Sequence, residues 1–163
     1  MQGKKVYQEK LFTQFRLSER VPKDNFYRQL KEVLDLTYLY PLTKKYYGNT
    51  GQKSLDPVVF FKLCLVGYLE NIISDRKLIA HCSMRMDILY FIGYDIEDEL
   101  PWHSTISRTR QLFPEELFEQ VKKFEPLLQK VNPQITVAKG GGGVDIGPLM
   151  ETGVPGCKPP TSG

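Results

Sequence analysis

The segment SLDPVVFFKLCLVGYLENII, residues 54–73, predicts a helix that is apolar on nearly every side. Asp56 suits its N-cap, and Pro57 suits the first helical position, where a missing backbone N–H removes no hydrogen bond. A helix without a polar face belongs in the interior of a fold. Gly67 lowers its helix propensity by roughly 1 kcal/mol, which indicates a close helix crossing at that point.

The chain upstream of this segment predicts another helix and a loop. Asp24 is a candidate N-cap, and apolar residues then recur at helical spacing from Phe26 to Tyr38. Pro41 is expected to end this helix. The stretch TKKYYGNTGQK that follows carries glycine and asparagine, so we expect it to form a loop.

The chain downstream predicts a series of further helices. Ser74 and Asp75 are expected to cap the short helix DRKLIAHCS, and the next helix, MDILYFIG, ends at Gly93. After the acidic connector YDIEDELP, Ser104 is a candidate N-cap for TISRTRQLF, and Pro114 begins PEELFEQVKKFEPLLQK. The whole pattern predicts an all-α fold, a multi-helix domain with helix-turn-helix-like elements and short connections.

The sequence changes character at Val131. Residues 131–163 hold eight of the 13 glycines and five of the 11 prolines. The one strand-like run there, QITVA, has no second strong strand to pair with, and a lone strand is not stable. We therefore expect a helical domain over residues 1–125 and an irregular Gly/Pro-rich tail over residues 126–163.

Length and composition indicate one soluble domain with a tail. The chain has 163 residues, of which 41% are hydrophobic, enough for a real core. No apolar run approaches membrane-spanning length, and the N-terminus lacks the apolar region of a signal peptide. The three cysteines, Cys64, Cys82 and Cys157, form no CxxC pair, which is typical of a reducing compartment. The expected location is cytoplasmic, with no membrane contact.

No motif in the chain predicts a catalytic residue, a metal site or a cofactor. His103 and Ser104 are adjacent, so they rarely point at one another, and no G-x-S-x-G turn surrounds the serine. The only other histidine, His81, stands in an unrelated stretch, so no ligand set for a metal is evident. The run GGGG, residues 140–143, matches neither the P-loop nor the dinucleotide-binding pattern.

Basic residues are the remaining candidates for function. Residues 1–53 hold eleven Lys/Arg against five Asp/Glu. Three candidate DNA-binding residues stand in the tyrosine-bearing loop: Lys44, Lys45 and Lys53. Two more, Arg108 and Arg110, stand on the helix expected after Ser104. A short helix after a turn, with basic residues in its early positions, is typical of the recognition element of a helix-turn-helix. The same residues are also consistent with an ordinary solvated surface, so both interpretations stay open.

Three stretches carry a resemblance to a known family: G..G...LDPVVFFKLCLVGYL, SDRKLIAHCSMRMDILYFIGYD and LPWHSTISRTRQLF. They occur in order, and residues 5–121 resemble the N-terminal (InsH-type) helical domain of bacterial insertion-sequence transposases. Trp102 stands where the family often has aspartate, and Thr109 where it often has phenylalanine. The resemblance implies a DNA-binding and assembly domain, with DNA and a homo-oligomer or a full-length transposase as partners.

The same resemblance implies that such a domain normally precedes a metal-dependent, ribonuclease-H-like core with an Asp-Asp-Glu triad. Here only Asp145 offers a carboxylate near the place expected for the first aspartate. A lone carboxylate cannot hold two metal ions for strand transfer. We therefore expect a truncated transposase that binds DNA and has no enzymatic activity.

The tail carries a second, shorter resemblance. The stretch GGGGVDIGPLMETGVPG, residues 140–156, is similar to one near the C-terminus of di-zinc aminopeptidases. This implies a join between unrelated reading frames near residues 121–133. Two alternatives to DNA binding therefore stay open: a helical protein-interaction module, and an inactive remnant of a zinc aminopeptidase fused to a helical domain.

Overall fold

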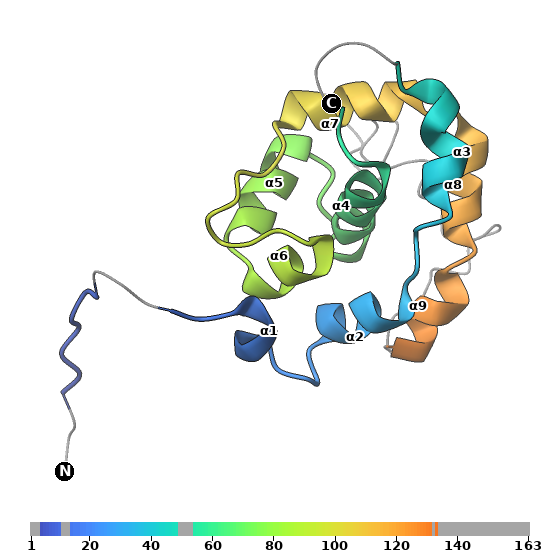
Figure 1. Cartoon of the computed structure of the whole chain (residues 1–163). Coiled ribbons are helices and arrows are strands. Elements are labelled where there is room, and N and C mark those ends of the chain that lie inside the picture. The colour runs from blue at the N-terminus through green and yellow to red at the C-terminus, as the bar shows by residue number, and fades with distance from the viewer. Residues whose placement is uncertain (1–3, 11–13, 49–53, 132, 134–163) are drawn as a thin grey trace, which may run out of the picture.

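Helices make up the regular secondary structure of the computed structural model, which describes residues 4–10, 14–48, 54–131 and 133 (Figure 1). Over these residues there are nine α-helices, one 3-10 helix and no strand. In chain order they are α1 (Leu17–Arg20), α2 (Phe26–Val33), α3 (Leu39–Thr43), η1 (Lys44–Tyr46), α4 (Pro57–Leu69), α5 (Asp75–Ser83), α6 (Met86–Ile92), α7 (His103–Leu112), α8 (Glu115–Lys122) and α9 (Glu125–Val131). The all-α prediction is confirmed.

The apolar segment that contains Pro57 forms α4, which the other helices surround in Figure 1. The predicted cap is present, because Asp56 Oδ1 accepts hydrogen bonds from the backbone N–H groups of Val58 at 2.7 Å and Val59 at 3.2 Å. The two phenylalanine side chains of α4, Phe60 and Phe61, are at most 1% exposed. The prediction of a central buried helix is therefore confirmed.

An aromatic cluster joins α4 to the junction between α7 and α8. Phe113, at that junction, stacks on Phe61 with ring centroids 5.7 Å apart, and its ring lies edge-on to Phe60 at 5.4 Å. Phe118 of α8 packs against Phe61 at 5.3 Å. Because aromatic side chains bury large areas, this cluster is a principal source of tertiary stability.

The close approach predicted at Gly67 is present. A Cβ atom built there would lie 3.1 Å from the carbonyl oxygen of Ile72 and 3.5 Å from Leu78 Cδ2. The neighbours are thus the backbone of the turn after α4 and a leucine of α5. The absence of a side chain at this position lets both approach α4.

Two boundaries upstream differ from the sequence prediction. Asn25, rather than Asp24, caps α2, because its side chain accepts the backbone N–H of Arg28. The helix ends at Val33, where Asp35 Oδ1 accepts both the backbone N–H of Thr37 at 2.9 Å and its hydroxyl at 2.7 Å. This local hydrogen bonding competes with the helix and ends it.

Pro41 was expected to end a helix but lies inside one. It is the third residue of α3, which follows Tyr38 at the N-cap. The prediction was wrong because the first-turn backbone N–H groups of a helix have no intrahelical acceptor, so proline costs no hydrogen bond there.

The helical packing continues beyond residue 125, where the predicted domain boundary lies. That boundary coincides with the start of α9, which packs against α2. Leu128 is only 2% exposed, and Phe124, just before α9, packs against Tyr38 at 6.0 Å. The expected irregular tail falls largely on residues 134–163, which lie outside the described residues.

The predicted cap at Ser104 is not observed. The N-cap of α7 is Trp102, which makes no side-chain capping hydrogen bond, and Ser104 is the second residue of the helix. Ser104 is also exposed. The prediction was wrong because helix formation begins two residues earlier than the serine indicates.

This difference gives a matched pair of substitutions. Asp56→Ala should lower the free energy of unfolding by about 1–2 kcal/mol, since it removes the N-cap of the central helix. Ser104→Ala should change it by less than about 0.5 kcal/mol, as for an ordinary surface position. Urea unfolding followed by circular dichroism measures both values. Equal losses for the two variants would contradict this assignment of the caps.

Candidate nucleic-acid interface

A largely buried ion pair holds α7 against the first turn of α5. The guanidinium of Arg110 donates to both carboxylate oxygens of Asp75, at 2.7 and 2.8 Å. The hydroxyl of Ser107 donates to the same carboxylate at 2.7 Å. The side chains of Arg110 and Asp75 are only 17% and 12% exposed. Arg110 therefore fixes the position of α7, and little of its guanidinium faces solvent.

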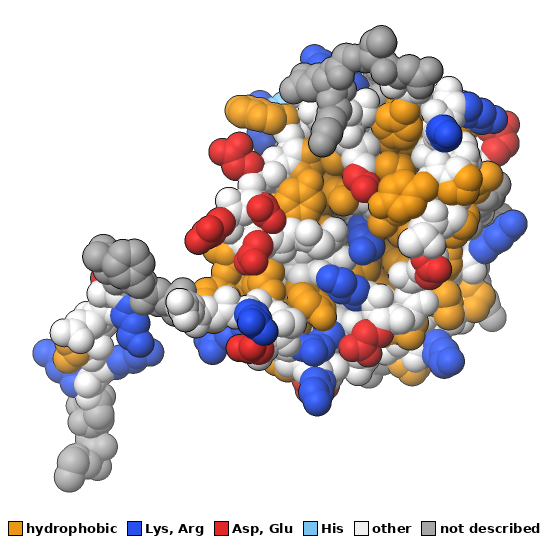
Figure 2. All heavy atoms as spheres, in the orientation of Figure 1, with side chains coloured by type: hydrophobic (Ala, Val, Ile, Leu, Met, Phe, Trp, Pro, Cys, Tyr) orange, Lys and Arg blue, Asp and Glu red, His pale blue; other side chains and the backbone are white. Residues whose placement is uncertain are grey.

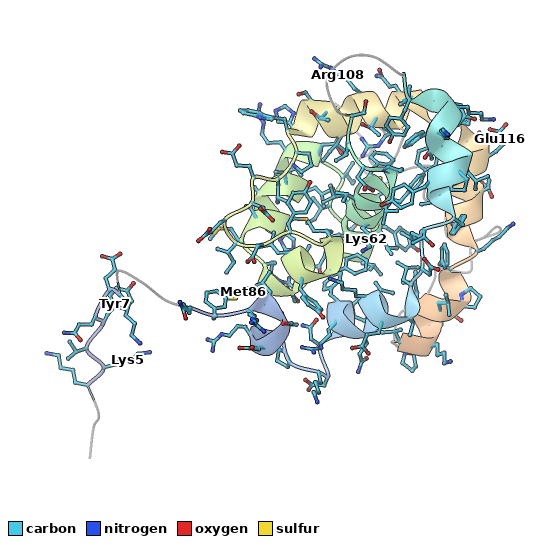
Figure 3. All side chains as sticks on the ribbon, viewed as in Figure 1. Lys5, Tyr7, Lys62, Met86, Arg108 and Glu116 are labelled. Atoms are coloured by element: carbon cyan, nitrogen blue, oxygen red, sulfur yellow. The ribbon has the colours of Figure 1, made fainter. Side chains whose placement is uncertain are left out.

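The opposite side of α7 faces solvent and is polar. Ile106 and Thr109 point into the body, at 0% and 6% exposed. Ser104, Arg108 and Gln111 are exposed, and their spacing of four and three residues places them on one side of the helix. In Figure 3 the side chain of Arg108 points away from the body. We call these three residues the outer stripe of α7.

Aromatic contacts place two of the predicted lysines beside the C-terminal end of α7. Tyr46 and Tyr47 pack edge-on against Phe113, which directly follows α7, with centroids 6.1 and 5.9 Å away. Lys44 and Lys45 belong to the same 3-10 helix, η1, and both are exposed. The structure therefore brings these lysines near the end of α7. The third predicted lysine, Lys53, lies outside the described residues.

Two basic residues that the sequence-based prediction did not include lie in the first turn of α5. Arg76 and Lys77 are exposed and directly follow Asp75, which contacts α7. Positive side chains at a helix N-terminus oppose the helix dipole, so they do not stabilise α5. The sequence signal that could have identified Arg76 and Lys77 as candidates is a basic pair directly after a helix cap, where acidic residues are preferred.

Residues 15–112 match a family described as "Transposase domain (DUF772)", which spans α1 to α7. The chain belongs to this transposase domain family. No match was found among curated proteins or among solved structures. The family match does not reach residues 140–156, and nothing in these comparisons supports the hypothesis of an aminopeptidase fragment there.

The transposase domain differs in one respect from the helix-turn-helix expected around α7. The tight turn lies between α5 and α6, which Met84 and Arg85 join, whereas residues 93–102 separate α6 from α7. Arg108 and Arg110 lie in the second half of α7, so the expectation of early basic positions was wrong. The reason is again the earlier start of the helix.

Helix α6 has no free polar face to present to DNA. Ile88, Leu89, Phe91 and Ile92 are at most 4% exposed, and the helix packs against α1, α2, α4 and α5. Its C-terminal end is covered as well, because Lys62 Nζ, labelled in Figure 3, donates to the carbonyl of Phe91 at 2.9 Å. The outward side of α7 is therefore the better candidate for nucleic-acid contact.

Both cysteines within the described residues belong to the hydrophobic core. Cys64 and Cys82 are buried free thiols, and burial raises the pKa of each to about 12. His81 lies 3.6 Å from Glu70 at the end of α4. Among the described residues, no group of three or more His, Cys, Asp or Glu side chains could hold a metal ion.

None of the helices in the described part of the chain combines the length and the apolar character required to cross a bilayer.

Proposed function

We propose that this transposase domain binds duplex DNA with the outer stripe of α7 in the major groove. The observation that carries the proposal is an exposed polar stripe on a helix whose other side is fixed to α5 by a largely buried ion pair. Arginine hydrogen-bonds well to guanine and glutamine to adenine, and serine suits either base. Arg108 and Gln111 are therefore the proposed base-reading residues, with Ser104 beside them.

The basic residues around α7 supply the proposed phosphate contacts. Arg76 and Lys77 come from α5, and Lys44 and Lys45 from η1, so two separate elements flank the helix. Lys53 is proposed for the same role from its place in the sequence. Phosphate contacts fix the orientation of a protein on the duplex without reading its sequence.

We assign Arg110 a different role from the one that the sequence indicated. Its guanidinium is paired with Asp75, so a phosphate would have to compete with a bidentate carboxylate at 2.7–2.8 Å. Arg110 is thus proposed as a positioning residue, which sets the orientation of α7 relative to α5.

We further propose that this chain contributes DNA recognition and assembly rather than strand cleavage. In the insertion-sequence transposases that it resembles, the Asp-Asp-Glu residues belong to a separate ribonuclease-H-like core. The proposed role is that of the DNA-binding part of a transposase. Incubation with supercoiled plasmid and Mg²⁺ or Mn²⁺ should leave the plasmid uncut, and nicking at a rate that scales with protein concentration would contradict this.

The salt dependence of DNA binding tests the proposed interface. A duplex selected from a random library should bind with log K falling against log salt by about 0.9 per phosphate contacted. The four flanking residues and Lys53 together predict a slope of roughly −3 to −5. Replacing Arg76 and Lys77 by alanine should reduce the slope by about 2 on every sequence.

Arg108→Ala should act differently, because Arg108 is proposed to read a base. We expect a loss of roughly 1–3 kcal/mol on the selected duplex and relaxed preference at one position. Lys23→Ala, an exposed residue in the turn between α1 and α2, is the matched control and should change neither affinity nor slope. Binding that ignores salt, or that survives the Arg108 and Arg76/Lys77 variants, would favour the protein-interaction alternative.

A further inference from the structure

A hollow between α5, α6 and the connector that leads to α7 has no role in the proposed DNA contact. Its volume is about 350 Å³, and it is lined by Ile79, Ser83, Leu89, Ile96, Asp98, Glu99, Leu100 and Trp102. Large apolar side chains form part of its rim, since Trp102 is 75% exposed and Ile96 is 47% exposed. We call it the connector groove. Exposed aromatic surface beside a concave apolar site is typical of a docking site.

Two of the residues that line the connector groove, Asp98 and Glu99, are acidic, and two more carboxylates stand just before them in the connector. Asp95, Glu97, Asp98 and Glu99 fall within five residues of the connector. The turn is held by local hydrogen bonds, in which Asp98 Oδ2 accepts the backbone N–H of Asp95 at 2.7 Å. Among the described residues none of these four carboxylates is paired with a lysine or arginine. An occupant with positive charge would relieve their mutual repulsion.

The N-terminal arm, residues 4–10, has the complementary character. It carries Lys4, Lys5 and Lys10 against the single Glu9. Every residue of the arm is exposed, and Figures 1 and 3 show it extended away from the helical body. Figure 3 labels Lys5 and Tyr7 on it. Tyr7 is 81% exposed, although an aromatic ring gains free energy when it is buried.

In Figure 2, acidic side chains line the edge of the body that faces the arm. An extended chain of seven residues is about 24 Å long. This is enough to set Tyr7 in an apolar groove while lysines on either side of it reach acidic groups at the rim.

We propose that the N-terminal arm of a second copy of this chain docks in the connector groove. Tyr7 packs beside Trp102 and Ile96, and Lys4 and Lys5 lie against Glu97 and Glu99. Each copy has one arm and one groove, so two copies that exchange arms satisfy both sites and form a closed, two-fold symmetric dimer. The contact area of two short arms is small, which predicts a weak dimer with a dissociation constant of about 10 μM.

Charge reversal in the full chain tests the arm exchange. The arm variant carries Lys4→Glu and Lys5→Glu, and the groove variant carries Glu97→Lys and Glu99→Lys. Each should weaken self-association in sedimentation velocity by at least about tenfold, because attraction is lost or becomes repulsion. An equimolar mixture should associate more tightly than either variant alone, since the unchanged arm of one faces the unchanged groove of the other.

Two further variants separate this proposal from a simple effect of net charge. Lys23→Glu with Lys130→Glu alters the charge as much as the arm variant does, at exposed positions outside both surfaces, and should leave the dimer unchanged. Tyr7→Ala should weaken the dimer without a change of charge. All variants should retain the helical circular dichroism signal, because the altered side chains are exposed.

Three outcomes would overturn the proposal. The first is a wild-type chain that stays monomeric up to about 100 μM, because this concentration is well above the dissociation constant expected for arm exchange. Self-association that neither charge variant changes uses another surface. An arm variant that loses DNA affinity while its sedimentation is unchanged identifies the arm as a DNA contact. Because the readout is molecular mass without DNA, failure here is distinct from failure of the proposed DNA interface.

Discussion

Replacing Phe61 by alanine should lower the free energy of unfolding by about 3–5 kcal/mol, as expected for the loss of a large and fully buried side chain. Phe61 is 1% exposed and contacts three other rings, those of Phe60, Phe113 and Phe118. Its loss removes buried apolar area and leaves a cavity that the rigid α4 backbone cannot close. Urea unfolding at constant temperature measures the change, and an unaltered m-value would show that the unfolded state is comparable.

Phe15 provides the matched control, because it is the same residue type at 45% exposure. Phe15→Ala should cost less than about 1 kcal/mol, since much of its ring is already in contact with water. If Phe61→Ala cost no more than Phe15→Ala, the aromatic cluster would not be the core of this fold.

The second large effect is expected at the ion pair between α5 and α7. Asp75→Ala should lower the free energy of unfolding by about 3 kcal/mol, because it removes the carboxylate partner of the largely buried Arg110 guanidinium. Arg110→Ala should also destabilise the fold, and the double variant should cost less than the sum of the single ones. A double-mutant cycle in urea measures this coupling. Arg108→Ala, on the exposed side of the same helix, should leave stability within about 0.5 kcal/mol.

The same variants separate positioning from DNA contact. If Arg110 only orients α7, Arg110→Ala should weaken DNA binding while the salt slope of the remaining affinity stays unchanged. Loss of a phosphate contact would reduce the slope by about 0.9. Binding must be measured at a temperature where each variant is folded. Additive stability effects of Asp75→Ala and Arg110→Ala would contradict the proposed role of the pair.

Local chemistry made much of the fold predictable. Twenty residues of sequence define the central helix by the cap at Asp56, the proline that follows it and the all-round apolar pattern. All three features are observed in the structure. Helix α5 begins at the predicted Ser74 cap, and α6 ends at Gly93 in the left-handed conformation that glycine favours. Such signals depend on neighbours three or four residues away, so no tertiary information is required to read them.

Local signals of this kind gave the wrong helix boundary at two places in the chain. Ser104 is a good capping residue, but α7 begins earlier, with Trp102 at its N-cap. Pro41 is a strong helix breaker, yet it is tolerated in a first turn. Serine does favour a cap and proline does disfavour a helix interior, but the effect of each depends on where the helix begins. The starting point of a helix depends in turn on how the helix packs.

The family assignment and the basic candidates also came from the sequence, but the distinction between the two arginines did not. Arg108 and Arg110 are two residues apart on one helix, and their types predict the same contact. Only the fold brings Asp75, thirty-five residues earlier in the chain, within 2.8 Å of Arg110 and leaves Arg108 in solvent. The connector groove likewise exists only where α5, α6 and the connector meet. Sequence periodicity determines which residues form helices and which faces of those helices are apolar. Long-range contacts decide which charges are paired, because pairing depends on the distance between chain segments in space.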